Sequence, residues 1–344
     1  MAYGTDELVY VGDKAGDGGV PGAMPFWLSP DVDIPAHSGV AFQGPNDVQI
    51  RVHCHEEPFL EEKITAEVYV GDPGFVMSPT LGTQRIDPGG LTWRPSGIPG
   101  TEPVADEVGS TQTFSWTPSS SATDVAGPGH RCLVVRAFPV SVTPPSSPFD
   151  VPNEQHEAQH NIEVLSTTKS MKSGGSGGGA GTPGDPKHRD PSDGMWWERF
   201  MTMAPKRRGK RYIVWAFDPK PSNEIVEMIS PLLKKSRVKG FSDEPPAAVT
   251  LVVEKPARGG QIGVKEINAD AAGSAGIGKG LFARKRLVAA AEIELGPRTQ
   301  SSLVMRFDHS NIQAGTAAML HAVQFDERGQ LEGGMTVVAR APTR

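Results

Sequence analysis

Residues 156–160 read His-Glu-Ala-Gln-His, the H-E-x-x-H pattern with which zinc peptidases hold their metal. In that chemistry both histidines bind one Zn²⁺ and the glutamate polarises the bound water, so the histidines must lie one helical turn apart. Residues 161–165 (Asn-Ile-Glu-Val-Leu) instead read as part of a β-strand. On a strand the two histidines lie about 13 Å apart, too far to share an ion. We therefore expect no catalytic residue, with a zinc metallopeptidase using His156, Glu157 and His160 as the alternative.

Histidine and cysteine also occur together at 53–55 (His-Cys-His) and 130–132 (His-Arg-Cys), and neighbouring strands that carry them could bind a metal. Alternation along a strand argues against a shared ion. If Cys54 points inward, His53 and His55 point outward, and the three side chains converge only at a β-bulge. We expect no metal at these residues.

Residues 273–280 (GSAGIGKG) come close to the phosphate-binding pattern G-x-x-x-x-G-K-[ST]. Gly280 stands where that pattern needs a hydroxyl for Mg²⁺, and residues 264–272 are not the buried parallel strand that must precede it. The segment is therefore predicted to be a glycine-rich surface loop. We expect no cofactor.

The segment 206–211 (KRRGKR) gathers basic side chains just before Tyr212 and Trp215. Basic clusters with aromatic residues are typical of nucleic-acid sites. The chain has a net charge of −6, however, and alternate aromatic residues of a strand belong to a core, so we expect no nucleic acid. The basic residues are interpreted as a solvated entry into a domain and a candidate contact for a protein partner: Lys206, Arg207, Arg208, Lys210 and Arg211.

A chain of 344 residues is long enough for two domains of about 150 residues each. No stretch approaches the roughly 20 apolar residues of a membrane-spanning helix, and residues 1–19 lack the basic start and apolar run of a Sec signal peptide. We expect no membrane span, and a protein that is cytoplasmic or exported with an assembly.

Charge is unevenly divided between the two halves of the chain. Residues 1–165 carry 22 acidic and 7 basic side chains, a net charge of −15, whereas residues 166–344 carry 18 acidic and 27 basic ones, a net charge of +9. Opposite charges predict that the halves attract each other at low ionic strength.

Residues 172–194 contain no apolar side chain larger than alanine or proline. Such a segment cannot bury enough surface to offset the entropy of ordering it, so it is predicted to be a flexible Gly/Ser/Pro-rich linker. The predicted domains are therefore 1–166 and 195–344, with the linker at 167–194.

Both domains have the pattern of β-strands. In residues 46–54, Val48, Ile50 and Val52 alternate with polar residues, and residues 64–70 repeat the pattern before a Gly-Asp-Pro-Gly turn. Similar runs in the second domain occupy 211–217, 248–255, 261–267, 290–295, 302–307 and 317–339.

The second domain adds a predicted hairpin and a predicted helix. Asp326-Glu327-Arg328-Gly329 is a hairpin turn with glycine where a positive φ is needed. One helix is predicted near 222–235, with Ser222 as N-cap and with Pro231 ending or kinking it. The adjacent tryptophans Trp196 and Trp197 are expected to plug an edge of this domain.

The first domain resembles bacterial immunoglobulin-like modules of the CARDB-like kind over residues about 25–165. The phrases that carry the resemblance are WLSPDVDI (27–34), NDVQIRVHC (46–54), AEVYVGDPG (66–74), FSWTP (114–118), HRCLVV (130–135) and EAQHNIEVL (157–165). The last phrase is similar to the family's final strand. The resemblance implies facing strands for Cys54 and Cys132, with two buried thiols or one disulfide as the alternatives. The second domain is similar to immunoglobulin-like domains without matching a defined family.

The sequence therefore predicts an all-β protein of two immunoglobulin-like antiparallel β-sandwiches with at most one short helix. By resemblance of fold, it is expected to be a non-catalytic structural or binding protein of a bacterial surface or multiprotein assembly. A protein partner or self-association is expected, and an accessory protein that docks on a larger particle is a further alternative.

Overall fold

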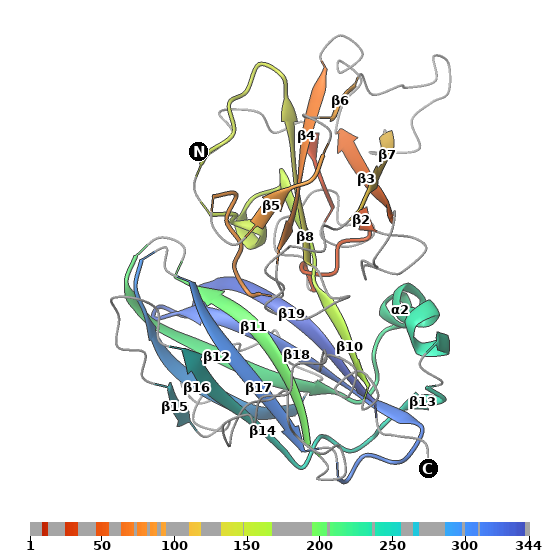
Figure 1. Ribbon diagram of the computed structural model, residues 1–344, viewed down its shortest axis with the longest axis vertical. Helices are drawn as coiled ribbons and strands as arrows, with labels where there is room; N and C mark the ends of the chain where they lie inside the picture. The colour runs from red at the N-terminus through yellow and green to blue at the C-terminus, as the bar shows by residue number, and fades with distance from the viewer. Residues whose placement is uncertain are drawn as a thin grey trace, which may run out of the picture.

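The computed structural model describes most strands of the chain and leaves several connections out (Figure 1). The described residues are 9–12, 25–33, 46–54, 63–71, 74–80, 83–87, 91–93, 110–117, 132–146, 148–166, 195–204, 207–235, 238–255, 264–267, 286–297, 300–308 and 310–340. The predicted linker, the P-loop-like segment 273–280, Lys206 and His55 lie outside them, as do the side chains of Cys54, Trp196 and Trp197.

The first sandwich consists of two antiparallel sheets. One holds β1 (Val9–Tyr10), β3 (Asn46–Cys54), β2 (Val32–Asp33) and β7 (Ser110–Trp116), with β3 pairing all the others. The other has the order β5-β4-β8-β9, with β6 also on β4: β5 (Thr83–Arg85), β4 (Ile64–Gly71), β8 (Cys132–Pro139), β9 (Glu157–His160) and β6 (Leu91–Trp93).

The core of the first sandwich follows from the alternation predicted along its strands. Val48, Ile50 and Val52 of β3 are buried, and they share one apolar cluster with the alternate residues of β4 and β8. The inward residues are Ile64, Ala66, Val68 and Val70 on β4 and Leu133, Val135 and Ala137 on β8. The other side chains of β4 and β8 therefore form an outer face of this sheet.

The second sandwich pairs a large sheet with a small one. The large sheet has the order β10-β19-β18-β12-β16-β15, with β13 also on β18: β10 (Ile162–Ser166), β19 (Leu331–Arg340), β18 (Thr316–Asp326), β12 (Gly209–Asp218), β16 (Arg286–Leu295), β15 (Val264–Ile267) and β13 (Gly240–Phe241). The small sheet holds β11 (Met195–Met203), β17 (Gln300–Asp308) and β14 (Ala248–Lys255). Two pairs, β10 with β19 and β13 with β18, are parallel, which departs from the purely antiparallel expectation.

The hairpin and helix predicted for the second domain are both present. β18 and β19 form an antiparallel pair whose turn places Gly329 at φ 76°. The helix, α2 (Asn223–Lys235), starts after Ser222, whose Oγ accepts the Ile225 N–H at 3.4 Å. The helix does not end at Pro231 but continues to Lys235. Ile225 and Leu233 on its apolar face are buried against the sheet, and this packing favours helix beyond the proline.

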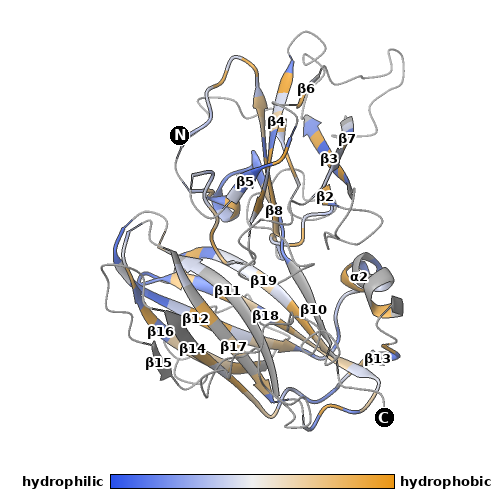
Figure 2. Ribbon diagram, viewed as in Figure 1, coloured by the Kyte–Doolittle hydropathy of each residue, from blue (hydrophilic) through white to orange (hydrophobic). Residues whose placement is uncertain are grey.

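Both faces of the large sheet are covered. One face packs on the small sheet around Trp215, Leu303, Met305 and Phe307. The other face packs on α2 and on one end of the first sandwich, so the two units meet along a buried surface (Figure 1). Apolar and polar residues alternate along strands of both units (Figure 2). No helix among the described residues is long and apolar enough to span a membrane.

Candidate functional site: the junction between the two sandwiches

The chain changes from one sandwich to the other at Asn161. β9, just before it, pairs with β8 of the first sandwich, whereas β10, just after it, pairs in parallel with β19 of the second. The expectation of one final strand of the first domain over 157–165 is therefore wrong. Both halves of the segment form strands without a break in the sequence between them, so the sequence pattern does not show which sheet each half joins.

Asn161 is fully buried and uses all of its polar groups. Its N–H donates to Trp27 O at 2.7 Å and its carbonyl accepts the Thr336 N–H at 3.2 Å. The side-chain Nδ2 donates to Gly74 O at 2.5 Å and to Gly334 O at 3.1 Å, and the Cys132 thiol donates to Oδ1. Because Gly74 and Cys132 belong to the first sandwich and Gly334 to the second, this amide ties the two units together.

Trp27 enters the second sandwich at a pair of glycines on β19. Its Nε1 donates to Thr336 Oγ1 at 2.8 Å. A Cβ on Gly334 would lie 2.1 Å from Trp27 Cε3, and a Cβ on Gly333 would lie 1.7 Å from the carbonyl oxygen of Phe75. Both distances are far below van der Waals contact, so only glycine permits the first sandwich to approach β19 this closely.

Apolar side chains from both units surround these polar contacts. Phe75 of the first unit lies 6.3 Å from Trp215 between ring centroids and joins the core of the second sandwich. The shared cluster holds Phe26, Trp27, Leu28, Met77, Cys132, Val134, Phe149 and Val151 from one side, and Val214, Ala216, Met319, Val323, Phe325 and Val338 from the other. The junction is therefore a common core, and the polar contacts described across it join uncharged groups.

An aspartate, a histidine and a hydroxyl lie in line behind Trp27. His321 Nε2 is 3.2 Å from Asp218 Oδ2, and His321 Nδ1 is 3.0 Å from Thr336 Oγ1. This order is that of an acid-base-nucleophile triad. Here, however, the hydroxyl oxygen accepts the Trp27 N–H and is completely buried, so no substrate reaches it. We call Trp27, Asn161, Asp218, His321 and Thr336 the junction cluster.

Sequence reasoning does not find the junction cluster. Trp27 and Thr336 are 309 residues apart, and Asp218 and His321 are 103 residues apart. Only the glycine pair on β19 is a local signal, because glycine inside a strand often marks the close approach of another backbone.

The H-E-x-x-H residues lie on a turn and a strand, without the helix that a zinc peptidase needs. His156 Nδ1 is 2.7 Å from Glu154 Oε1, and Glu157 Oε2 accepts the Asp150 N–H at 2.5 Å. His160 Nδ1 donates to Ser29 O at 3.1 Å, while its buried Nε2 has no hydrogen-bond partner among the residues that the structure describes. No cluster of three or more metal-ligating side chains occurs in the part of the chain that the structure describes.

The two cysteines belong to different parts of the first sandwich. Cys132 is on the outer face of β8, in the junction, while Leu133 and Val135 turn towards the core shared with β3. The bridge to Cys54 stays a prediction. Next to Cys54, His53 stacks on Tyr10 with centroids 5.0 Å apart, and its Nε2 lies 2.7 Å from Asp31 Oδ2.

The basic segment is partly neutralised by acidic residues. Arg208 pairs with Glu294 at 2.9 Å and Lys210 with Glu292 at 2.8 Å, and the latter bond raises the pKa of Lys210. Arg211 is buried, with its Nε 2.6 Å from Glu332 Oε2, and burial raises the pKa of that carboxyl. Arg207 is exposed. A role of this segment in partner contact stays a prediction.

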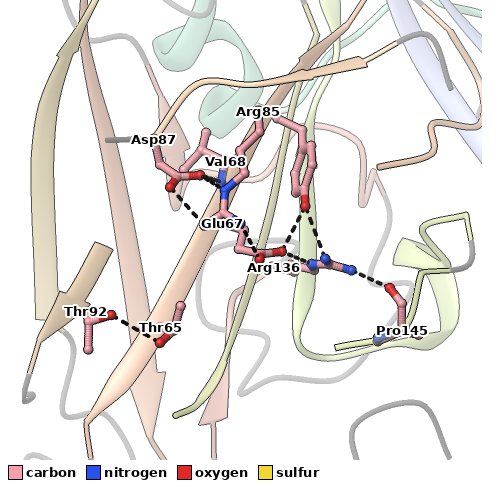
Figure 3. A network of polar contacts seen from close by, with 9 residues as sticks. Thr65, Glu67, Val68, Arg85, Asp87, Thr92, Arg136 and Pro145 are labelled. Carbon is pink, nitrogen blue, oxygen red and sulfur yellow. Dashed lines mark hydrogen bonds and ion pairs between the residues drawn. The ribbon is translucent and has the colours of Figure 1, made fainter. Parts of the chain in front are cut away.

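A second buried polar group lies on the outer face of β4 and β8 (Figure 3). Arg136 donates from Nε to Glu67 Oε2, from Nη2 to Tyr69 Oη at 3.1 Å and from Nη1 to Pro145 O at 2.6 Å. Arg85 bonds Glu67 at 2.6 Å and holds Asp87 through two nitrogens at 2.7 and 3.0 Å. We call Glu67, Tyr69, Arg85, Asp87 and Arg136 the sheet-face cluster.

The sheet-face cluster holds the chain after β8 against the sheet. The guanidinium of Arg136 lies 5.5 Å from the Tyr69 ring centroid and 5.9 Å from that of Phe149. Burial raises the pKa of Tyr69 to about 12. The signal that sequence reasoning missed is one acidic residue in the apolar run of β4 and one basic residue in that of β8, because buried charges of opposite sign are expected to pair.

Comparisons with known proteins identify no relative. No protein family and no curated protein matches the chain. Among solved structures, the collagen adhesin (CNA) from S. aureus aligns at 6% identity over 91% of this chain and 96% of that one, with a TM-score of 0.20. CBD12 from CALX1.2 aligns at 8% identity over 86% of this chain and 93% of that one, with a TM-score of 0.19. The collagen binding domain of the Erysipelothrix rhusiopathiae surface protein RspB aligns at 8% identity over 89% of this chain and 95% of that one, with a TM-score of 0.18. TM-scores this low do not establish a shared fold, so we assign the fold from the sheets and the apolar cores of this chain.

Proposed function

We propose that this chain is a non-catalytic structural or binding protein of a bacterial surface or multiprotein assembly. It acts through its β-sandwich domains on protein partners or on further copies of itself. The domain boundaries 1–166, 167–194 and 195–344 are part of the proposal, with β10 as the strand that the first domain adds to the large sheet of the second.

The observation that carries the proposal is the junction. Two sandwiches share a buried core in which Trp27, Asn161 and Thr336 fix one unit on the other. Such a joint holds binding surfaces at a constant distance and angle, which is useful to a structural protein. The residues with catalytic potential support the same conclusion, because the Asp218, His321 and Thr336 side chains serve the joint itself.

The test is to isolate the tagged full-length chain from its native host without chelator. We expect less than one zinc per chain by elemental analysis, and one or more proteins, or further copies of the chain, cross-linked to it in a fixed ratio by mass spectrometry. One equivalent of zinc that is lost on His160→Gln, together with zinc-dependent peptide hydrolysis, would establish the metallopeptidase alternative. A chain that is monomeric and free of partners in every fraction would also overturn the proposal.

A further inference from the structure

The parallel pair of β10 and β19 joins the two sandwiches and resists a force that pulls them apart. Its register runs from Ile162 beside Thr336 to Ser166 beside Arg340. β10 receives the chain from the first sandwich at Ile162, and β19 is the strand by which the chain leaves the second sandwich at Arg340 (Figure 1).

A force that separates the two units along the chain therefore acts at opposite ends of two parallel strands. The first sandwich pulls β10 at Asn161, and a load applied on the C-terminal side of Arg340 pulls β19 at its other end. Loaded in this way, the strands slide along each other, and the hydrogen bonds between them must break together. Strands pulled apart from the same end would instead lose their bonds one after another, at a lower force.

The strands on either side of this pair are better anchored than the pair itself. β19 also pairs with β18 from Ala317 beside Arg340 to Phe325 beside Leu331. β9 is held by β8 on one edge and on its other edge by Leu28 and Ser29, whose N–H donates to Gln159 O at 2.9 Å. Among the described residues β10 pairs only with β19, over five residues. Among the described strands along this path, β10 is therefore held on one edge only, and under load its pair with β19 acts together with the Trp27 and Asn161 contacts of the junction.

The chain between the units is much longer than the closed junction needs. Ser166, the last residue of β10, lies beside Arg340, which pairs with Ala317 at the start of β18. Met195, the first residue of β11, lies beside Asp308, and residues 309–315 connect Asp308 to the start of β18. The ends of β10 and β11 are therefore at the same end of the second sandwich, where a connection of about 4–6 residues is usual. The sequence has 28 residues there, 167–194.

We propose that the β10–β19 pair is a mechanical clamp, which keeps the sandwiches docked under tension and opens before either of them unfolds. This inference rests on the proposed structural role. After opening, residues 162–194 would still join the units. These 33 residues span at most about 120 Å when fully extended.

The test is single-molecule pulling of the full-length chain, with an azide-bearing amino acid at exposed Val140 as one handle and a C-terminal tag as the other. Val140 follows the end of β8 opposite to Cys132, and thus lies far from the junction. We expect a first rupture with a contour gain on the order of 100 Å, before the larger gains of the unfolding sandwiches. Moving the second handle to exposed Arg328, before the start of β19, should give the same gain at a lower force.

Two proline variants provide matched controls. Because the Thr336 N–H donates to Asn161 O, the alternation of a parallel ladder points the Leu165 N–H at β19 and the Val164 N–H away from it. Leu165→Pro should lower the first rupture force by about a fifth or more, and Val164→Pro should leave it unchanged.

Three results would overturn the clamp: no rupture near 100 Å before the larger ones, equal forces from both pulling directions, or equal effects of the two prolines. None of these results depends on which partner the protein binds, so they leave the proposed function to be judged separately.

Discussion

The outer face of β4 and β8 changes character along its length. Near the junction it presents Cys132 and Val134, which pack on the second sandwich, and farther from it Glu67 and Arg136, which form the sheet-face cluster. The two buried polar clusters thus differ in the groups they join. Across the junction, Trp27 and Asn161 donate to an uncharged hydroxyl and to carbonyl groups, whereas the sheet-face cluster consists mainly of ion pairs.

The difference reflects what covers each part of the face. The second sandwich excludes water from the junction, where an unpaired charge would be very costly, so the contacts between the units join neutral groups, and Asp218 of the junction cluster is paired with His321 within the second sandwich. Among the described residues, the segment after β8 covers the sheet-face cluster with Pro145 and Phe149, and 37% of the Arg85 side chain stays exposed. Water at that edge lowers the cost of keeping charges there.

The largest effect is expected from adding a methyl group where the backbones of the two sandwiches touch. In Gly333→Ala the new Cβ would meet the backbone oxygen of Phe75, which cannot rotate away, so we expect the free energy of unfolding to fall by about 3 kcal/mol. Gly240→Ala is the matched control, because nothing lies within 4 Å of its new Cβ. Urea unfolding followed by tryptophan fluorescence measures both. Equal stability of the two variants would show that the sandwiches do not dock on β19.

Removing the central charge of the sheet-face cluster should have the next largest effect. Arg136→Met leaves Glu67 buried with one cation fewer and Pro145 O without its donor, and we expect a loss of about 2–3 kcal/mol in the free energy of unfolding. Arg208→Met removes an ion pair whose arginine is 66% exposed and should cost under about 0.5 kcal/mol. Amide chemical shifts should change in the first sandwich only. Changes that spread into β18 and β19 would mean that the two clusters act as one.

The two clusters also show how far the sequence predicts this structure. Local patterns predict β3 and β4, the Ser222 cap and the Gly329 turn correctly, because alternation, capping and positive φ depend on neighbouring residues. The change of sheet at Asn161 could not be predicted, because it depends on Gly334 and Thr336 far along the chain. Pro231 was predicted to end or kink α2: the end is wrong, because α2 continues to Lys235 and Leu233 packs on the core beyond it, and the kink stays a prediction.

A smaller effect is expected from the uncharged bonds of the junction. Asn161→Ala removes the donor to Gly74 O and Gly334 O, and two buried carbonyls that lose a donor should cost about 2 kcal/mol. Because no charge is removed, this cost should be the same at low salt and at about 0.5 M salt. Asn153→Ala removes an exposed bond to Asp150 and should cost little. A cost for Asn161→Ala that vanishes at high salt would indicate that attraction between the oppositely charged halves, rather than the amide, holds the units together.

The smallest effect concerns the Tyr69 hydroxyl, which donates to Glu67 Oε2 at 2.9 Å and accepts from Arg136. Burial raises its pKa to about 12, above the usual value of 10.0. The unfolded chain therefore loses this proton first, and the stabilisation that comes from the neutral phenol declines as the pH rises from about 10 to about 12. Tyr69→Phe should cost about 1 kcal/mol at neutral pH, and its deficit relative to the wild type should shrink across that interval.

The check on this last prediction is an ultraviolet titration of the phenolates together with unfolding at each pH. The chain has four tyrosines, and the phase that titrates near pH 12 should be absent from Tyr69→Phe. If that phase persists undiminished in the variant, it belongs to another tyrosine, because Tyr69 is not the only buried tyrosine among the described residues. If the deficit of the variant grows with pH instead of shrinking, then the ionised phenolate is better stabilised than the phenol, and Arg136 rather than burial would dominate the environment of Tyr69.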